Sequence, residues 1–247
     1  MAENVSLLQY LLVALCALGA GTLGGVAGYG TGLLMPLVLV PIVGADAVVP
    51  IIGVSALLTN GSRVVAFRHE VDLRRALVVG SVAIPTCFLG AYGYTFLSGA
   101  GASILIGSFL IAMVPLRMVL KRLRARLSGT GLAAAGAGYG LLAGGTSGSG
   151  VVLISILMAS GLNGRAVVAT DAIISMAIGV AKTGAFQAFG ALPPSSWIMA
   201  LLVGLSATPG AFIAKRLTEA LPIHIHNAIL DAAIVCGGVI LVAQGLR

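Results

Sequence analysis

Long apolar runs follow one another from one end of the chain to the other, separated by short polar or glycine-rich stretches. A helix needs about 20 apolar residues to cross a bilayer core of about 30 Å. Runs of this length predict six membrane-spanning helices, at 46–66, 76–97, 102–120, 166–189, 196–214 and 222–244.

Four shorter runs form two broken pairs. A helix over 6–23 is followed by a run at 31–43, and a helix over 130–143 is followed by a run at 150–160. A helix of about 12 residues spans only ~18 Å, so neither second run can cross the membrane alone. Each pair therefore predicts a helix, a glycine-rich elbow and a half-helix, either as a re-entrant hairpin or as two crossings.

The two elbows are similar in composition and position. Superposing Gly30 on Gly148 also superposes Gly32 on Gly150. Matched interruptions in two halves of a membrane protein indicate a transporter binding site. We expect the elbows to meet near the middle of the membrane and to bind a small anion through Gly28, Tyr29, Gly30, Thr31 and Gly32 of the first, and Gly145, Thr146, Ser147, Gly148 and Ser149 of the second.

The order of segments predicts one membrane domain built from two repeats, 1–126 and 130–247, with a basic linker at 117–129. Each repeat has five segments, counting both arms of the broken pair. An odd number inverts the second repeat relative to the first. Because basic loops stay in the cytoplasm, we place 67–75, 117–129, 161–165 and 215–221 inside. In this orientation Lys182 is the only basic residue deep in the membrane.

Composition agrees with an all-α polytopic membrane protein. Hydrophobic residues make up 59% of the 247-residue chain and charged residues 9%, against about 25% charged in soluble domains. The net charge of +7 does not indicate nucleic-acid binding, because the basic residues lie in short loops that set orientation. The three cysteines have no metal-ligand spacing, and we expect no metal and no cofactor.

The elbows carry the candidate anion chemistry. The N-terminus of a half-helix offers unpaired backbone N–H groups and a partial positive charge. Thr31 and Ser149 occupy positions where a hydroxyl could cap the helix or contact a ligand. The alternative is that the small residues only allow close helix packing. Asn60 and Thr59, in the first-half span that corresponds to that of Lys182, could line the pore or bridge helices by hydrogen bonds.

Lys182 is the strongest single candidate for anion binding, because a buried ammonium needs a charged or polar partner or a water-filled cavity. It could be the counter-charge for a sulfonate. Pairing with Asp171 is the first alternative, but 11 positions along a helix separate the two by ~16 Å. The second alternative is that Lys182 extends toward the membrane interface.

Asp171 and Asp231 are candidates for proton coupling, since a carboxyl group in an apolar segment can exchange protons near neutral pH. For Asp171, an equal alternative is a local ion pair with Arg165 or a helix cap near the membrane edge.

The glycine repeats, Asn60, Pro85 with Gly90, Lys182 and Pro209-Gly210 together resemble the TauE/SafE family of sulfite exporters, also called TSUP transporters. The resemblance extends from about residue 10 to 245. It implies an inner-membrane permease of bacteria or archaea that moves sulfite, organosulfonates or related small anions, usually outward.

We therefore expect a secondary transporter that works by alternating access, and not an enzyme. Its partners would be the anion and the lipid bilayer, with proton coupling as a hypothesis and homo-oligomers left open. A passive anion channel of the same fold is one alternative. Gly145-Thr146-Ser147-Gly148 also matches a short pattern of rhomboid-like intramembrane serine proteases, but that chemistry has no role for an internal duplication.

Overall fold

The computed structural model describes residues 5–25, 30–122, 127, 129–217 and 223–246. Within these residues the chain is entirely helical, which confirms the predicted all-α fold. The helices are α1 (Leu7–Gly25), α2 (Gly30–Val43), α3 (Ala45–Phe67), the short 3-10 helix η2 (Arg68–Glu70), α4 (Leu73–Thr95), α5 (Gly99–Arg122), α6 (Thr130–Gly145), α7 (Gly150–Ala159), α8 (Arg165–Ala188), α9 (Pro194–Leu217) and α10 (Ile223–Gly245). Each predicted segment corresponds to one α-helix, and their ends differ by at most three residues.

Helix length separates full spans from half-helices. Among the described residues, α3, α4, α5 and α8 are long and apolar enough to cross a membrane, and α9 and α10 contain 24 and 23 residues. The second arms of the broken pairs are much shorter, at 14 residues for α2 and 10 for α7. At 1.5 Å per residue they are about 21 and 15 Å long, so neither can cross a bilayer by itself.

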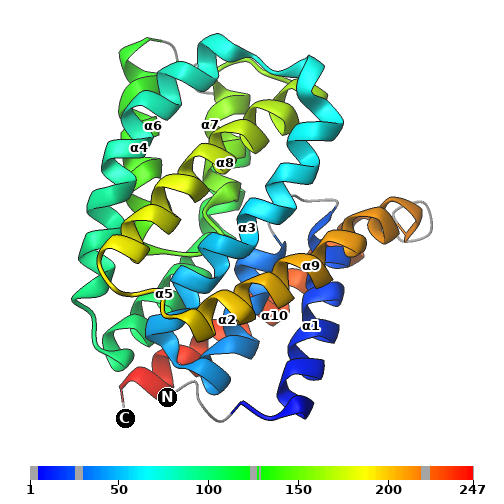
Figure 1. Cartoon of the computed structure of the whole chain (residues 1–247). Coiled ribbons are helices and arrows are strands. Elements are labelled where there is room, and N and C mark those ends of the chain that lie inside the picture. The colour runs from blue at the N-terminus through cyan, green and yellow to red at the C-terminus, as the bar shows by residue number, and fades with distance from the viewer. Residues whose placement is uncertain (1–4, 26–29, 123–126, 128, 218–222, 247) are drawn as a thin grey trace.

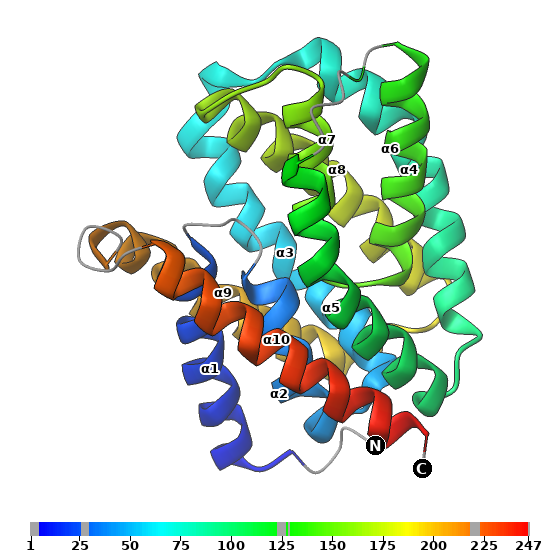
Figure 2. The same ribbon diagram turned by 180° about the vertical axis from the view of Figure 1, so that it is seen from behind.

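The helices pack in matched pairs. α3 and α8 lie side by side at the centre, α4 packs on α6 at one side of the molecule, and α1 packs on α9 at the other (Figure 1). α10 lies along α5, as the view from behind also shows (Figure 2). The contacts are symmetric when α1–α5 are matched in order with α6–α10. The α4–α6 contact then corresponds to α9–α1, the α3–α9 contact to α8–α4, and the α2–α3 contact to α7–α8. All of these contacts are present.

Glycines allow the outer helix pairs to pack backbone to backbone. A Cβ atom at Gly140 of α6 would lie 2.2 Å from the Ala83 carbonyl oxygen of α4, and one at Gly144 would lie 2.1 Å from the Cys87 carbonyl oxygen. On the opposite side, a Cβ atom at Gly21 of α1 would lie 2.3 Å from the Ala207 carbonyl oxygen of α9. Small residues at such spacing are typical of helix interfaces in membranes, where close approach supplies the packing energy.

Large apolar side chains cover the outside of the helices. Leu77 of α4 is 70% exposed, and Leu15, Leu89, Ile198 and Leu205 are also more than half exposed. A surface this apolar would be unfavourable in water. It fits a helical protein whose outer faces contact lipid.

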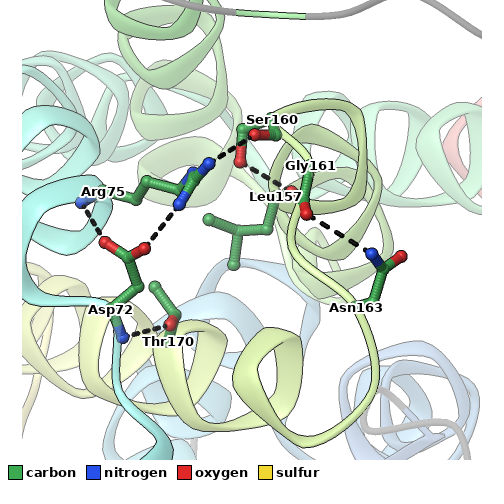
Figure 3. Close-up of polar contacts among 7 residues, drawn as sticks. All are labelled: Asp72, Arg75, Leu157, Ser160, Gly161, Asn163 and Thr170. Atoms are coloured by element: carbon green, nitrogen blue, oxygen red, sulfur yellow. Dashed lines mark hydrogen bonds and ion pairs between the residues drawn. The ribbon is translucent and has the colours of Figure 1, made fainter.

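A polar cluster ties the loop before α4 to the turn after α7. Asp72 caps α4 by accepting the Arg75 N–H at 2.9 Å, and its carboxylate also pairs with the Arg75 guanidinium. Arg75 then donates across to the Ser160 carbonyl at 2.8 Å, while the Asp72 N–H donates to Thr170 Oγ1 of α8 at 3.0 Å (Figure 3). The backbone N–H of Arg75 lowers the pKa of the Asp72 carboxyl below its ordinary value of 3.8.

These contacts fix the directions of the two half-helices. The end of α7 lies against the start of α4 through Arg75 and Ser160. The end of α2 lies near the other end of α4, where the Tyr94 hydroxyl donates to the Ala45 carbonyl just after α2. α2 and α7 therefore run in opposite directions along α4.

Gly140→Ala should destabilise the protein, because the new methyl group has no room between α6 and α4. Overpacking of this kind costs about 1–3 kcal/mol. Gly138→Ala is the matched control on the same helix, since a Cβ atom there meets nothing within 4 Å. That control should be neutral or slightly stabilising, because alanine favours a helix by about 1 kcal/mol over glycine. Melting temperatures in detergent measure both, and equal values for the two variants would contradict this packing.

Asp72→Ala should lower the melting temperature, because it removes the α4 cap and the ion pair; loss of a cap costs about 1 kcal/mol. Asp72→Asn should lose less, since asparagine also caps helices. The carboxylate contribution is present above the ordinary pKa of 3.8 and is lost as the pH falls through the lowered folded value. The difference between wild type and Asp72→Asn should therefore shrink on acidification, and a difference that grows would contradict this role.

Candidate binding site

A cavity of about 110 Å³ lies where the two broken helix pairs meet. A buried water needs only about 10–15 Å³, so this cavity has room for several waters or one small oxyanion. Its lining comes from α2, α3, α6, the α6–α7 connection, α7 and α8: Thr31, Gly32, Ile52, Gly53, Ala56, Thr59, Asn60, Arg63, Tyr139, Ala143, Thr146, Ser147, Gly148, Ser149, Gly150, Asp171, Ser175, Ile178, Gly179 and Lys182.

The two elbows touch at a pair of glycines. A Cβ atom at Gly32 would lie 2.7 Å from both the Cα and the N of Gly148, so no larger residue fits there. Gly148 also has a φ of 81°, a conformation that favours glycine. The expectation that the two breaks meet is confirmed.

Both half-helices begin at the cavity. Thr31 lies in the first turn of α2, and Gly150 is the first residue of α7. Ser149 occupies the N-cap position of α7, but its hydroxyl makes no capping hydrogen bond to the helix. Two helix N-termini, each with a partial positive charge, therefore border the same small volume.

Lys182 donates hydrogen bonds to backbone carbonyl groups at the end of α6. Its Nζ donates to the carbonyl oxygens of Ala143 and Thr146, each at 2.6 Å, and the side chain is only 5% exposed. These carbonyls are groups that a helix end leaves without an internal partner. Both alternatives considered for this lysine are wrong, because it neither pairs with Asp171 nor extends to the interface. Among the described residues no acceptor takes its third N–H donor.

Asp171 pairs with Arg63 of α3, across the interface between the two halves. Arg63 Nη2 lies 2.8 Å from Asp171 Oδ2, and Nη1 donates to Asn60 Oδ1 at 3.1 Å. The alternative of a local ion pair with Arg165 is therefore wrong. The side chain of Arg63 is 18% exposed and also lines the cavity, so Lys182 is not the only basic residue there.

Two buried polar atoms at the cavity have no hydrogen-bond partner among the described residues. They are Ser147 Oγ and Asp171 Oδ1, in residues that are 3% and 1% exposed. Buried polar groups are nearly always hydrogen-bonded, to protein or to something the protein binds. The cavity also holds two cations, Arg63 and Lys182, against one carboxylate. Its chemistry suits an anion with several oxygen acceptors.

The structure brings together nine of the residues expected at the site: Thr31, Gly32, Asn60, Thr146, Ser147, Gly148, Ser149, Asp171 and Lys182. Gly30 begins α2 and Gly145 ends α6, beside the lining residues rather than among them. Gly28 and Tyr29 lie outside the described residues. Asp231 is half-buried on α10 and does not line this cavity.

Thr59, expected with Asn60 as a pore-lining candidate, lines the cavity, whereas Arg63, Tyr139 and Ser175 were not predicted from the sequence. The Tyr139 side chain is buried, and its hydroxyl lies beside those of Ser149 and Ser175. The sequence does contain a pattern that places Arg63 beside Asn60 in the same span. Arg63 lies three residues after Asn60, so the two share a helix face, and apolar residues continue after it to Phe67.

Comparison with known proteins gives one match. The family model described as sulfite exporter TauE/SafE matches residues 13–241. No curated protein and no solved structure gave a significant match. The matched segment contains every α-helix except the ends of α1 and α10, and the whole of the cavity. The chain therefore belongs to the sulfite exporter TauE/SafE family.

Proposed function

We propose that this protein is a secondary transporter that moves a small oxyanion, such as sulfite or an organosulfonate, out of the cell across the inner membrane. The single observation that carries the proposal is the cavity in which two half-helix N-termini converge with Arg63 and Lys182. Half-helices that start near the centre of a membrane and point at a shared site are typical of transporters that bind anions. Family membership favours transport over the protease alternative.

Alternating access would come from relative movement of helix groups around the cavity, in which α4 with α6 and α1 with α9 each move together because they pack backbone to backbone. We propose two inverted repeats, 1–126 and 130–247. The exchange of helix contacts between the halves and the opposite directions of α2 and α7 support this division. The cluster of Asp72, Arg75, Ser160 and Thr170 joins two segments that the positive-inside rule places in the cytoplasm. Opening the cavity toward that side would break these contacts.

Ser147 offers the cleanest test of the binding site. Its hydroxyl has no protein partner among the described residues, so Ser147→Ala removes no internal hydrogen bond. If the hydroxyl contacts the anion, KM should rise about two- to tenfold, the equivalent of 0.5–1.5 kcal/mol. Uptake of radiolabelled sulfite into proteoliposomes measures this.

Thr183→Val is the matched control for that experiment. Its hydroxyl is also buried and without a partner in the described part of the chain, but Thr183 does not line the cavity. Flux in this variant should equal that of wild type. Equal KM values in Ser147→Ala and wild type would remove Ser147 from the site.

Lys182→Met should reduce saturable flux by at least about tenfold, because a charge-assisted hydrogen bond is worth about 1.5–3 kcal/mol. Elution as a single species in detergent would show that the variant folds. Counterflow separates a carrier from a passive channel, since only a carrier accelerates labelled uptake when unlabelled anion is on the other side. Flux that neither saturates nor shows counterflow would favour the channel.

A further inference from the structure

The Arg63–Asp171 ion pair crosses the interface between α3 and α8 inside the cavity. The carboxylate is almost fully buried, with its side chain 2% exposed, whereas the guanidinium side chain is 18% exposed. A buried ion pair is favourable only when hydrogen bonds satisfy its remaining donors and acceptors. Asp171 Oδ1 accepts no hydrogen bond of normal geometry among the described residues, and the Ser175 hydroxyl is a neutral group that lies near this carboxyl.

Arg63 is the better anchor for an oxyanion of the two cations. Two of its five N–H donors are used, one by Asp171 and one by Asn60, and the planar guanidinium matches two oxygens of a sulfonate or sulfite. Lys182 has two of its three donors fixed on the α6 carbonyls. An anion that uses Nη2 as one of its two donors competes there with the Asp171 carboxylate.

Among the groups packed around Asp171, Arg63 is the cation that pairs with its carboxylate. α3 brings Arg63, α6 brings Tyr139, and α4 brings the thiol of Cys87 near that tyrosine. The start of α4 also brings Asp72, which is paired with Arg75 and whose N–H donates to Thr170 beside Asp171. Arg165, at the start of α8, is exposed. The titratable groups of η2, which also packs on α8, are exposed: Arg68, His69 and Glu70. The described residues of α7 carry no titratable side chain. On α8 itself, Lys182 is held by the α6 carbonyls.

We propose that a singly charged oxyanion displaces the Asp171 carboxylate from Arg63, and that Asp171 takes up one proton from water as it is displaced. This inference rests on the proposed function and specifies its coupling. A buried carboxylate without its cation is strongly unfavourable, so the displaced group binds a proton instead. The protonated carboxyl can then donate its O–H to the bound anion.

The charges of the cavity balance in this exchange. Before binding, Arg63, Lys182 and the Asp171 carboxylate sum to one positive charge. After binding, the added anion and the added proton cancel, so the sum is unchanged. One monovalent anion is therefore bound together with one proton, and the ligand class is a monovalent sulfonate or bisulfite rather than a divalent oxyanion.

The test measures methanesulfonate binding to the purified full-length protein by calorimetry between about pH 5 and pH 8, a range in which this probe stays monovalent. Binding coupled to uptake of one proton should weaken about tenfold per pH unit wherever the free carboxyl is ionised. Asp171→Asn, a neutral isostere that leaves Arg63 free, should bind with the same affinity across the range and at least as tightly as wild type at the upper end.

Arg63→Gln leaves Asp171 unpaired and can fail to fold, so Arg63→Gln combined with Asp171→Asn is the second variant. This neutral pair should fold and lose binding by more than about tenfold. Retained binding would overturn the assignment of Arg63.

Three further outcomes overturn the proposal. Wild-type affinity that does not change with pH would remove the coupling while leaving the proposed function intact. Loss of pH dependence in Asp231→Asn instead of Asp171→Asn would place the coupling on α10. Absence of saturable binding in wild type and in Asp171→Asn would overturn this inference together with the proposed function.

Discussion

A helix that stops inside a membrane leaves backbone N–H and C=O groups that lipid cannot satisfy, and this constraint organises the centre of the molecule. At the end of α6, the Lys182 ammonium takes two of the free carbonyls. At the start of α7, the N–H groups face the cavity and Ser149 provides no side-chain cap. Lys182 satisfies one end of the break, and the other end borders the cavity. The site is thus a consequence of the interruption in the helix.

Glycine makes this arrangement physically achievable. Gly32 and Gly148 let the two elbows touch, and the glycines of α6 and α1 let the outer helices approach backbone to backbone. Packing of this kind resists small displacements, because a Cβ atom would already overlap a carbonyl oxygen. These contacts join α4 to α6 and α1 to α9, so each of these helix pairs should move as a unit that contains helices of both repeats, with the weaker polar contacts at loops and turns breaking and reforming.

The fold could be predicted from the sequence because its signals are local. Run length separates spans from half-helices, and glycine positions mark the breaks, so each predicted segment matches a helix. The lining residues could be predicted in part for the same reason, since Thr31, Ser147 and Ser149 adjoin those breaks. Partners could not. Arg63 and Asp171 are 108 residues apart, and Lys182 binds backbone carbonyls that carry no residue-type signature. Both contacts depend on how α3, α6 and α8 pack.

The central claim is that the cavity between the two helix breaks holds the transported oxyanion. Selenite is a chemical analogue of sulfite whose selenium scatters X-rays anomalously, so crystals of the protein grown with selenite test the claim directly. The account predicts an anomalous peak within hydrogen-bonding distance of Ser147 Oγ and the Arg63 guanidinium. A well-occupied selenite site elsewhere between the helices, with no peak in this cavity, would contradict it.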